Sequence, residues 1–110
     1  MSLLNNATVT TAADKQAAAT EAARQNLKAE RDAALQAMVY TFADGRKIQT
    51  RPQDEGNIRK RIAQGADNVF MMEDNMPRMT TLVEYEAALN HGLEAGEGIW
   101  MDYIIAVAEL

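Results

Sequence analysis

Large apolar residues stand at every second position of residues 38–42 and again at Ile48, and an Asp-Gly pair lies between them. Glycine adopts a positive φ without a Cβ clash and aspartate tolerates the adjacent turn position, so this pattern predicts a β-hairpin. A two-residue loop would place Tyr40 opposite Gln49 and leave neither face apolar. A three-residue loop, 43–45, places Tyr40 opposite Ile48, and we expect this register because a slip of one residue would turn the apolar residues to solvent. The face so formed consists of Met38, Tyr40, Phe42 and Ile48.

A helix start follows the hairpin directly. The Thr50 hydroxyl is placed to accept from the Gln53 amide while the Gln53 side chain reaches back, as in a capping box. Pro52 fits the first helical turn, where a missing N–H costs nothing. We expect this helix to run to Gln64 and to end at Gly65, which favours the left-handed conformation of a helix C-terminus.

Residues 11–38 are rich in alanine and contain no glycine or proline, which gives them a very high helix propensity. A helix of this length spans about 40 Å, more than the diameter of a compact domain of this size. Its apolar stripe offers little area, because most of its members are alanines. Two interpretations stay open: a coiled stalk or oligomer contact, or an intrachain helix whose first half is loosely held.

A second hairpin is predicted from a strand at 68–72, a turn at 73–75 and a return strand at 76–79. Pro77 lacks a backbone donor, so the return strand belongs at a sheet edge. Four methionines lie in this segment. We expect them to fill the core under the sheet; the alternative is an adaptable binding surface.

The last helix begins at a second capping box, Thr81 to Glu84, and its apolar residues keep a helical period to the end of the chain. We predict one continuous helix, with a break at 95–98 as the alternative because glycines lower helix propensity. Gly92 and Gly96 fall on the apolar stripe, where we expect another backbone to approach, with the alanines of the first helix as the candidate.

The fold class is therefore α+β, in the order helix, hairpin, helix, hairpin, helix, with a small antiparallel sheet flanked by two long helices. We expect a flexible tail at 1–10 and a single domain at 11–110, in which 11–38 can project and 39–110 form the compact part. The expected core is Tyr40, Phe42, Ile48, Ile58, Ile62, Phe70, Leu89, Ile99, Trp100 and Tyr103. The expected helix contacts, and interface candidates, are Leu27, Ala34, Gly92 and Gly96.

The net charge of −5 is unevenly distributed. Residues 1–38 carry four acids and four bases, residues 39–65 three acids and six bases, and residues 66–110 nine acids and one base. Attraction between the basic middle and the acidic last part is the simplest consequence, within one chain or between copies. The basic residues are Arg46, Lys47, Arg51, Arg59, Lys60 and Arg61. A nucleic-acid patch is the alternative, weakened by the acidic chain and the lack of interleaved aromatic residues for base stacking.

The residue inventory argues against an enzyme. Cysteine is absent, Ser2 is the only serine and His91 the only histidine, so one chain cannot build a Ser-His-Asp or Cys-His arrangement. His91 and Glu94 lie one helical turn apart, but two ligands do not make a metal site. The paired carboxylates of the last helix lack any sign of a cleft that would shift their pKa values. We expect no catalytic, metal or cofactor residues.

The first residues lack the pattern of a signal peptide, and no apolar run approaches the roughly 18 residues of a membrane helix. This pattern predicts a cytoplasmic protein.

Several short segments, in this order, resemble a small domain family of unknown function from bacteriophages and prophages, whose members often end tail-fibre or other tail-associated proteins. The segments are Arg31-Asp32-Ala33-Ala34-Leu35, Tyr-Thr-Phe-Ala-Asp-Gly at 40–45, Ile48-Gln49-Thr50-Arg51, Asp54, Asn57-Ile58, Asp74-Asn75 and Thr80. The resemblance covers roughly residues 28–110, and Phe70 stands where the family commonly has tryptophan. It implies a structural or interaction protein in the tail or its assembly, with other phage tail or assembly proteins as partners, in the bacterial host cytoplasm or the virion. A homo-oligomer through the helix of 11–38 is the further partner that the alanine-rich stretch allows.

Overall fold

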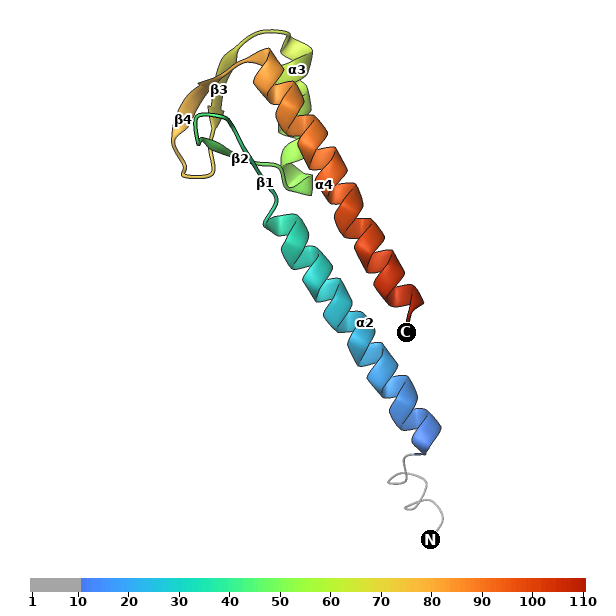
Figure 1. Ribbon diagram of the computed structural model, residues 1–110. Helices are drawn as coiled ribbons and strands as arrows, with labels where there is room; N and C mark the ends of the chain where they lie inside the picture. The colour runs from blue at the N-terminus through green and yellow to red at the C-terminus, as the bar shows by residue number, and fades with distance from the viewer. Residues whose placement is uncertain (1–10) are drawn as a thin grey trace.

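The computed structural model describes residues 11–110, and the tail expected at 1–10 lies outside this range. The elements follow the predicted α+β order, which is confirmed (Figure 1). They are α2 (Ala12–Gln36), β1 (Val39–Thr41), β2 (Lys47–Gln49), the 3-10 turn η1 (Pro52–Asp54), α3 (Glu55–Gln64), β3 (Asn68–Met71), β4 (Pro77–Thr80) and α4 (Leu82–Ala108).

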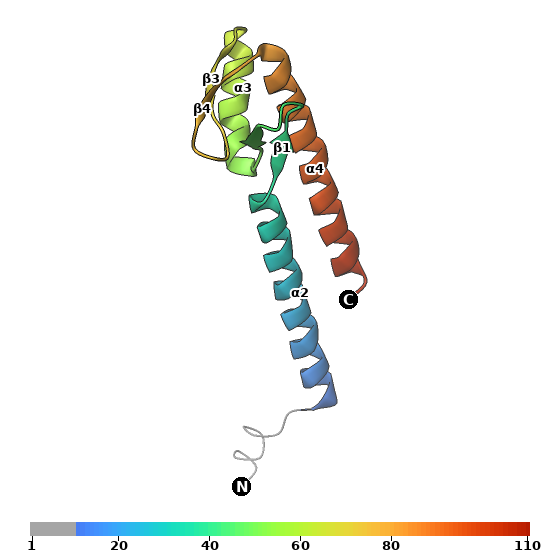
Figure 2. The same ribbon diagram turned by 60° about the vertical axis from the view of Figure 1, so that its left-hand side comes forward.

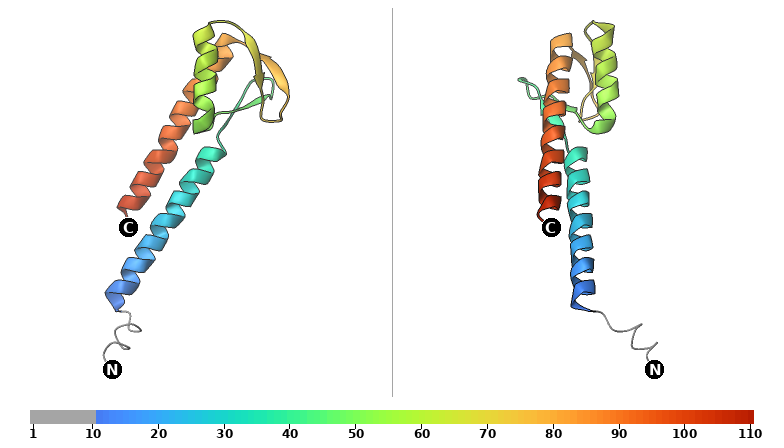
Figure 3. Two further views of the ribbon diagram at one scale, coloured as in Figure 1. Left: turned by 180° about the vertical axis from the view of Figure 1, so that it is seen from behind. Right: turned by 90° about the vertical axis from the view of Figure 1, so that its right-hand side faces the viewer.

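The molecule is elongated, with principal extents of 75 × 25 × 25 Å and a radius of gyration of 21.7 Å. A compact chain of this length would have a radius of gyration of about 13 Å. The two long helices run antiparallel and side by side, and α2 extends beyond the last turn of α4 (Figures 2 and 3). We call α2 together with residues 93–108 the arm. The head comprises residues 38–92, which include both hairpins, α3 and the first part of α4.

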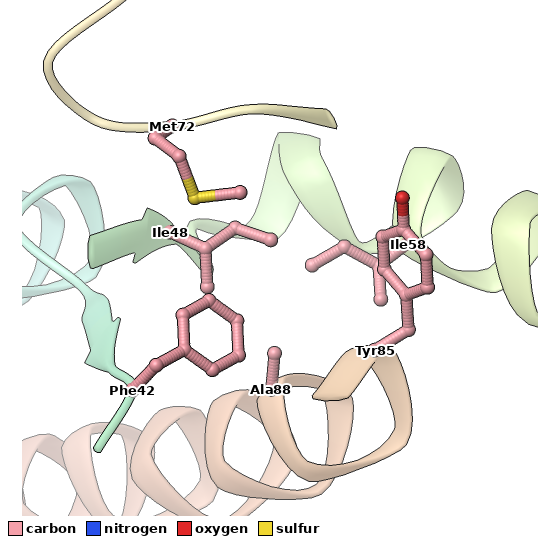
Figure 4. Packing of buried hydrophobic residues seen from close by; sticks show 6 residues of the cluster. All are labelled: Phe42, Ile48, Ile58, Met72, Tyr85 and Ala88. Carbon is pink, nitrogen blue, oxygen red and sulfur yellow. The ribbon is translucent and has the colours of Figure 1, made fainter. Parts of the chain in front are cut away.

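The core of the molecule lies in the head, where side chains from both hairpins and two helices meet (Figure 4). Ile48, Ile58 and Tyr85 are at most 1% exposed. The Tyr85 hydroxyl donates to the backbone oxygen of Asn68 at 3.0 Å, so its polar atom is satisfied inside the core. The buried cluster is Phe42, Ile48, Ile58, Met72, Tyr85 and Ala88.

The first hairpin has the expected register. Tyr40 pairs with Ile48, the Phe42 N–H donates to the Arg46 oxygen at 2.8 Å, and Gly45 adopts a φ of 90°. The two hairpins form separate two-stranded sheets, not one continuous sheet. The Glu73 N–H, which donates to the Lys47 oxygen at 2.8 Å, links one hairpin to the other.

The helix boundaries confirm most of the predicted signals and correct one. Thr81 caps α4 as expected: its hydroxyl accepts from the Glu84 N–H at 3.1 Å, and Glu84 accepts from the Thr81 N–H at 2.9 Å. The capping box predicted at Thr50 is wrong. The chain enters a 3-10 turn at Pro52, which moves the start by one residue, and the Asp54 carboxylate accepts from the Arg51 N–H at 3.1 Å.

Thr50 is instead buried, and its hydroxyl finds no hydrogen-bond partner among residues 11–110. Gln53, its expected partner, exchanges side-chain hydrogen bonds with Gln36 of α2 at 2.7 and 3.1 Å. Helix α3 ends at Gly65 in the left-handed conformation, as predicted. Helix α4 continues without a break through its three glycines.

Two expectations about burial are wrong. Of the four methionines in the second hairpin only Met72 is buried, while Met71, Met76 and Met79 are 47–61% exposed. The hairpin is an outer layer, so only one of its faces meets the core. Trp100, expected in the core, is 44% exposed because it lies in the arm, where α2 covers one side of α4.

Candidate interaction surfaces

The expected helix contacts divide into two pairs. Leu27 and Ala34 lie on the side of α2 that faces α4, where they line a groove of about 290 Å³ together with Ile99, Tyr103 and Ala106. Gly92 and Gly96 do not face the alanines of the first helix, as was expected, but other residues. A Cβ on Gly92 would lie 3.1 Å from the Cβ of Thr50, and a Cβ on Gly96 would lie 3.6 Å from the end of Met38.

Arg31 connects the two helices of the arm. Its guanidinium carbon lies 4.4 Å from the centre of the Trp100 ring and 4.6 Å from that of Tyr103, and it also pairs with Asp32 at 2.8 Å. The two rings meet edge to face at 5.9 Å. Cation–π contacts at such a site contribute about 0.5–1 kcal/mol. Arg31 thus lies over both rings, yet Trp100 remains 44% exposed.

Much of the surface of α4 in the arm is apolar and open to solvent. Residues 99–108 contain a single charged residue, Asp102. A helix that is apolar around most of its circumference is normally buried, yet here α2 covers only one side. The exposed residues, which we call the arm face, are Leu93 (43%), Trp100 (44%), Met101 (48%), Ile104 (54%) and Ile105 (52%).

The extent of the arm face exceeds that of ordinary surface apolar residues. Each of its five side chains is exposed over about half of its surface, on the order of 100 Å². Contiguous apolar patches of several hundred Å² on soluble proteins mark interaction sites. The prediction of the core included Trp100 but not Met101, Ile104 or Ile105. The near absence of charged residues over 99–108 is the sequence feature that could have identified these exposed apolar residues.

The six basic residues do not form one free patch. Arg46 pairs with Asp44 and Glu84 and donates to the Met79 oxygen at 2.8 Å. Two more of the six basic residues form ion pairs: Arg51 with Asp54 at 2.7 Å, and Arg59 with Glu55 at 3.5 Å. Lys47, Lys60 and Arg61 make no ion pair within residues 11–110. Half of the candidate nucleic-acid patch is therefore neutralised by carboxylates.

Among the ion pairs of residues 11–110, only Arg46–Glu84 joins the basic middle of the chain to its acidic last part; the other pairs of the basic residues are local. The Thr81 N–H lowers the pKa of Glu84, and the Arg46 guanidinium lowers it further. The expected attraction between the two segments thus operates at one point, which fixes the first hairpin to the start of α4.

The remaining polar candidates show no cluster. His91 is exposed, and its ring lies 5.1 Å from that of Tyr40. Over residues 11–110, no three His, Cys, Asp or Glu side chains come together as metal ligands would. Nor does any helix in this range combine the length and apolar character required to cross a membrane.

No family model, curated protein or solved structure matches this chain. The resemblance to the phage tail domains stays a prediction.

Proposed function

We propose that this chain is a non-enzymatic structural protein that assembles with copies of itself through the arm. The arm face carries the proposal: large apolar side chains are held half exposed on a rigid helix. Burying apolar surface contributes about 25 cal/mol per Å², so removing several hundred Å² from water is a strong driving force for association. Stable interfaces bury about 800 Å² per partner. The five side chains of the arm face expose roughly 500 Å², so the proposed contact includes neighbouring parts of the arm.

A second copy is the occupant that fits best, because the rest of the arm complements this face. Most side chains in the projecting part of α2, residues 12–19, are alanines, which permit close helix approach. Lys15 and Lys28 are exposed along α2, while Glu94 and Glu97 are exposed along α4. Arms of two copies laid side by side can place these opposite charges across the contact.

The proposed setting is a bacteriophage or prophage tail, or its assembly, with tail or assembly proteins as further partners. The resemblance of residues 28–110 to tail-associated domains supports this setting. The protein would act in the cytoplasm of the bacterial host or in the virion. Nucleic acid is not among the proposed partners, because three of the six basic residues already have carboxylate partners.

The test is the solution mass of the full chain by light scattering. We expect an oligomer for the wild type and a monomer for the double variant Ile104→Glu/Ile105→Glu, because two charges on the arm face oppose its burial. Val83→Glu is the matched control: Val83 lies on the same helix in the head, is 73% exposed, and its substitution should leave the mass unchanged.

Fluorescence gives a second readout of the same event. Trp100 is the only tryptophan and is 44% exposed, so its emission should shift to shorter wavelength as concentration rises and the arm becomes covered. A monomeric wild type at all concentrations would contradict self-assembly. Equal masses for Ile104→Glu/Ile105→Glu and Val83→Glu would place the contact elsewhere.

A further inference from the structure

A groove of about 550 Å³ lies in the head, between α3 and the second hairpin. It is separate from the arm face, and its two walls differ in chemistry. The α3 wall is polar and consists of Asn57, Lys60, Arg61 and Gln64. The hairpin wall is apolar and consists of Val69, Phe70, Met71 and Pro77.

Three residues of the apolar wall, Val69, Met71 and Pro77, lie on a hairpin face that lacks the usual polar residues. Val69 pairs with Met79 and Met71 with Pro77, so these four side chains share one face of the hairpin. Val69, Met71 and Met79 are 44%, 55% and 61% exposed. A solvent-facing side of an antiparallel hairpin is normally polar, because the apolar residues turn to the core. Here Phe70 lies on the opposite face, and the centre of its ring is 5.6 Å from that of Tyr85. Apolar residues therefore occupy both faces of the hairpin.

The polar wall carries positive charge without a counter-charge. Lys60 and Arg61 are adjacent on α3, and neither makes an ion pair within the described residues; Arg61 only reaches Gln64 at 3.4 Å. The groove lining contains no carboxylate. Arg59, their neighbour on α3, lies outside the groove and pairs with Glu55. In a chain of net charge −5, this positive wall stands out as a place where an acidic group would be stabilised.

We propose that this groove binds a segment of a partner protein in which acidic residues lie next to apolar ones. The acidic side chains lie against Lys60 and Arg61, and the apolar ones pack on Val69 and Met71. Methionine suits such a contact because its flexible side chain adapts to different shapes. The volume matches the 300–1,000 Å³ typical of pockets that hold small ligands, so the contact takes a few side chains of the segment.

The experiment is a selection from a library of random twelve-residue peptides, with the immobilised full chain as bait. We expect the enriched sequences to combine Asp or Glu with large apolar residues. The two test variants are Lys60→Glu/Arg61→Glu, which reverses the charge of the polar wall, and Met71→Ser, which removes apolar area from the other wall. Circular dichroism verifies that each variant keeps its helices.

Each variant has a matched control. Arg59→Glu reverses a charge on the same helix outside the groove, and Met76→Ser removes a methionine of similar exposure, 47%, that does not line it. Enriched peptides should bind both test variants at least tenfold more weakly and both controls as the wild type. Failure to enrich acidic peptides, or equal losses in test and control variants, would overturn the proposal.

The same variants separate this groove from self-assembly. The solution mass of Lys60→Glu/Arg61→Glu should equal that of the wild type, whatever that mass is. A fall in mass would place a second copy in the groove and overturn the assignment to a different partner. Failure of the arm to self-associate leaves the peptide experiment unaffected.

Discussion

The head and the arm use the same helix in different ways. In the head, Tyr85 and Ala88 of α4 are fully buried; in the arm, Trp100 and Ile104 of the same helix are about half exposed. Residues 82–92 carry two acidic side chains and the longer stretch 93–108 carries three, so charge content does not account for the difference. The number of elements that cover the helix does: α3 and the two hairpins surround the first part, and α2 alone lies beside the second (Figure 1). An apolar helix is thus a core in one place and an interaction surface in the other.

This contrast predicts that equal substitutions have unequal costs in the two regions. Ile58→Ala, at a residue 1% exposed, should lower the free energy of unfolding by about 3 kcal/mol through lost burial and the cavity left behind. Ile104→Ala, at a residue 54% exposed, should cost less than about 1 kcal/mol when measured at a concentration low enough to separate any associated copies. Urea denaturation measures both. Similar costs would mean that the arm is covered even in the monomer.

The glycines of α4 give a second contrast, of intermediate size. A Cβ at Gly92 would lie 3.1 Å from Thr50, whereas a Cβ at Gly98 would meet nothing within 4 Å. Gly92→Leu should therefore destabilise the head by about 1–3 kcal/mol through overpacking. Gly98→Leu should stabilise the arm by up to about 1 kcal/mol, because leucine has the higher helix propensity. Thermal unfolding of the two variants should move in opposite directions; a stable Gly92→Leu would show that Thr50 can move away.

The smallest effect concerns Glu84, which joins the first hairpin to α4. Its pKa in the folded state is lowered by the Thr81 N–H and then by Arg46, so its contribution is present above the unfolded value of about 4.3. That contribution is lost as pH falls through the lowered folded pKa. Glu84→Gln should cost about 1 kcal/mol at pH 7. The difference from the wild type should shrink as pH falls below about 4.3 and vanish only below the lowered folded pKa of Glu84.

Glu86→Gln is the control for this measurement, because Glu86 makes no ion pair within residues 11–110. Its unfolding curve should follow that of the wild type at every pH. A difference between Glu84→Gln and wild type that does not shrink as pH falls below about 4.3 would mean that the side chain stabilises the head by its shape and not by its charge.

The sequence by itself determined the features that depend on neighbouring residues. The Asp-Gly pair and the apolar spacing set the register that pairs Tyr40 with Ile48, and Gly65 set the end of α3. Thr81 and Glu84 set the start of α4 through hydrogen bonds three residues apart. Such signals can be recognised from sequence because the interacting residues lie close together along the chain.

Only the tertiary structure decided which apolar side chains became core and which became surface. The sequence predicted that Trp100 and Met71 are core residues, but both are exposed. Burial depends on which other elements cover a helix or strand, and not on its own sequence alone. The neighbours of Gly92 were equally undetermined, since Thr50 lies far away along the chain. The arm face and the groove beside α3 follow from the same physics: they form where packed elements end before all of the apolar surface is covered.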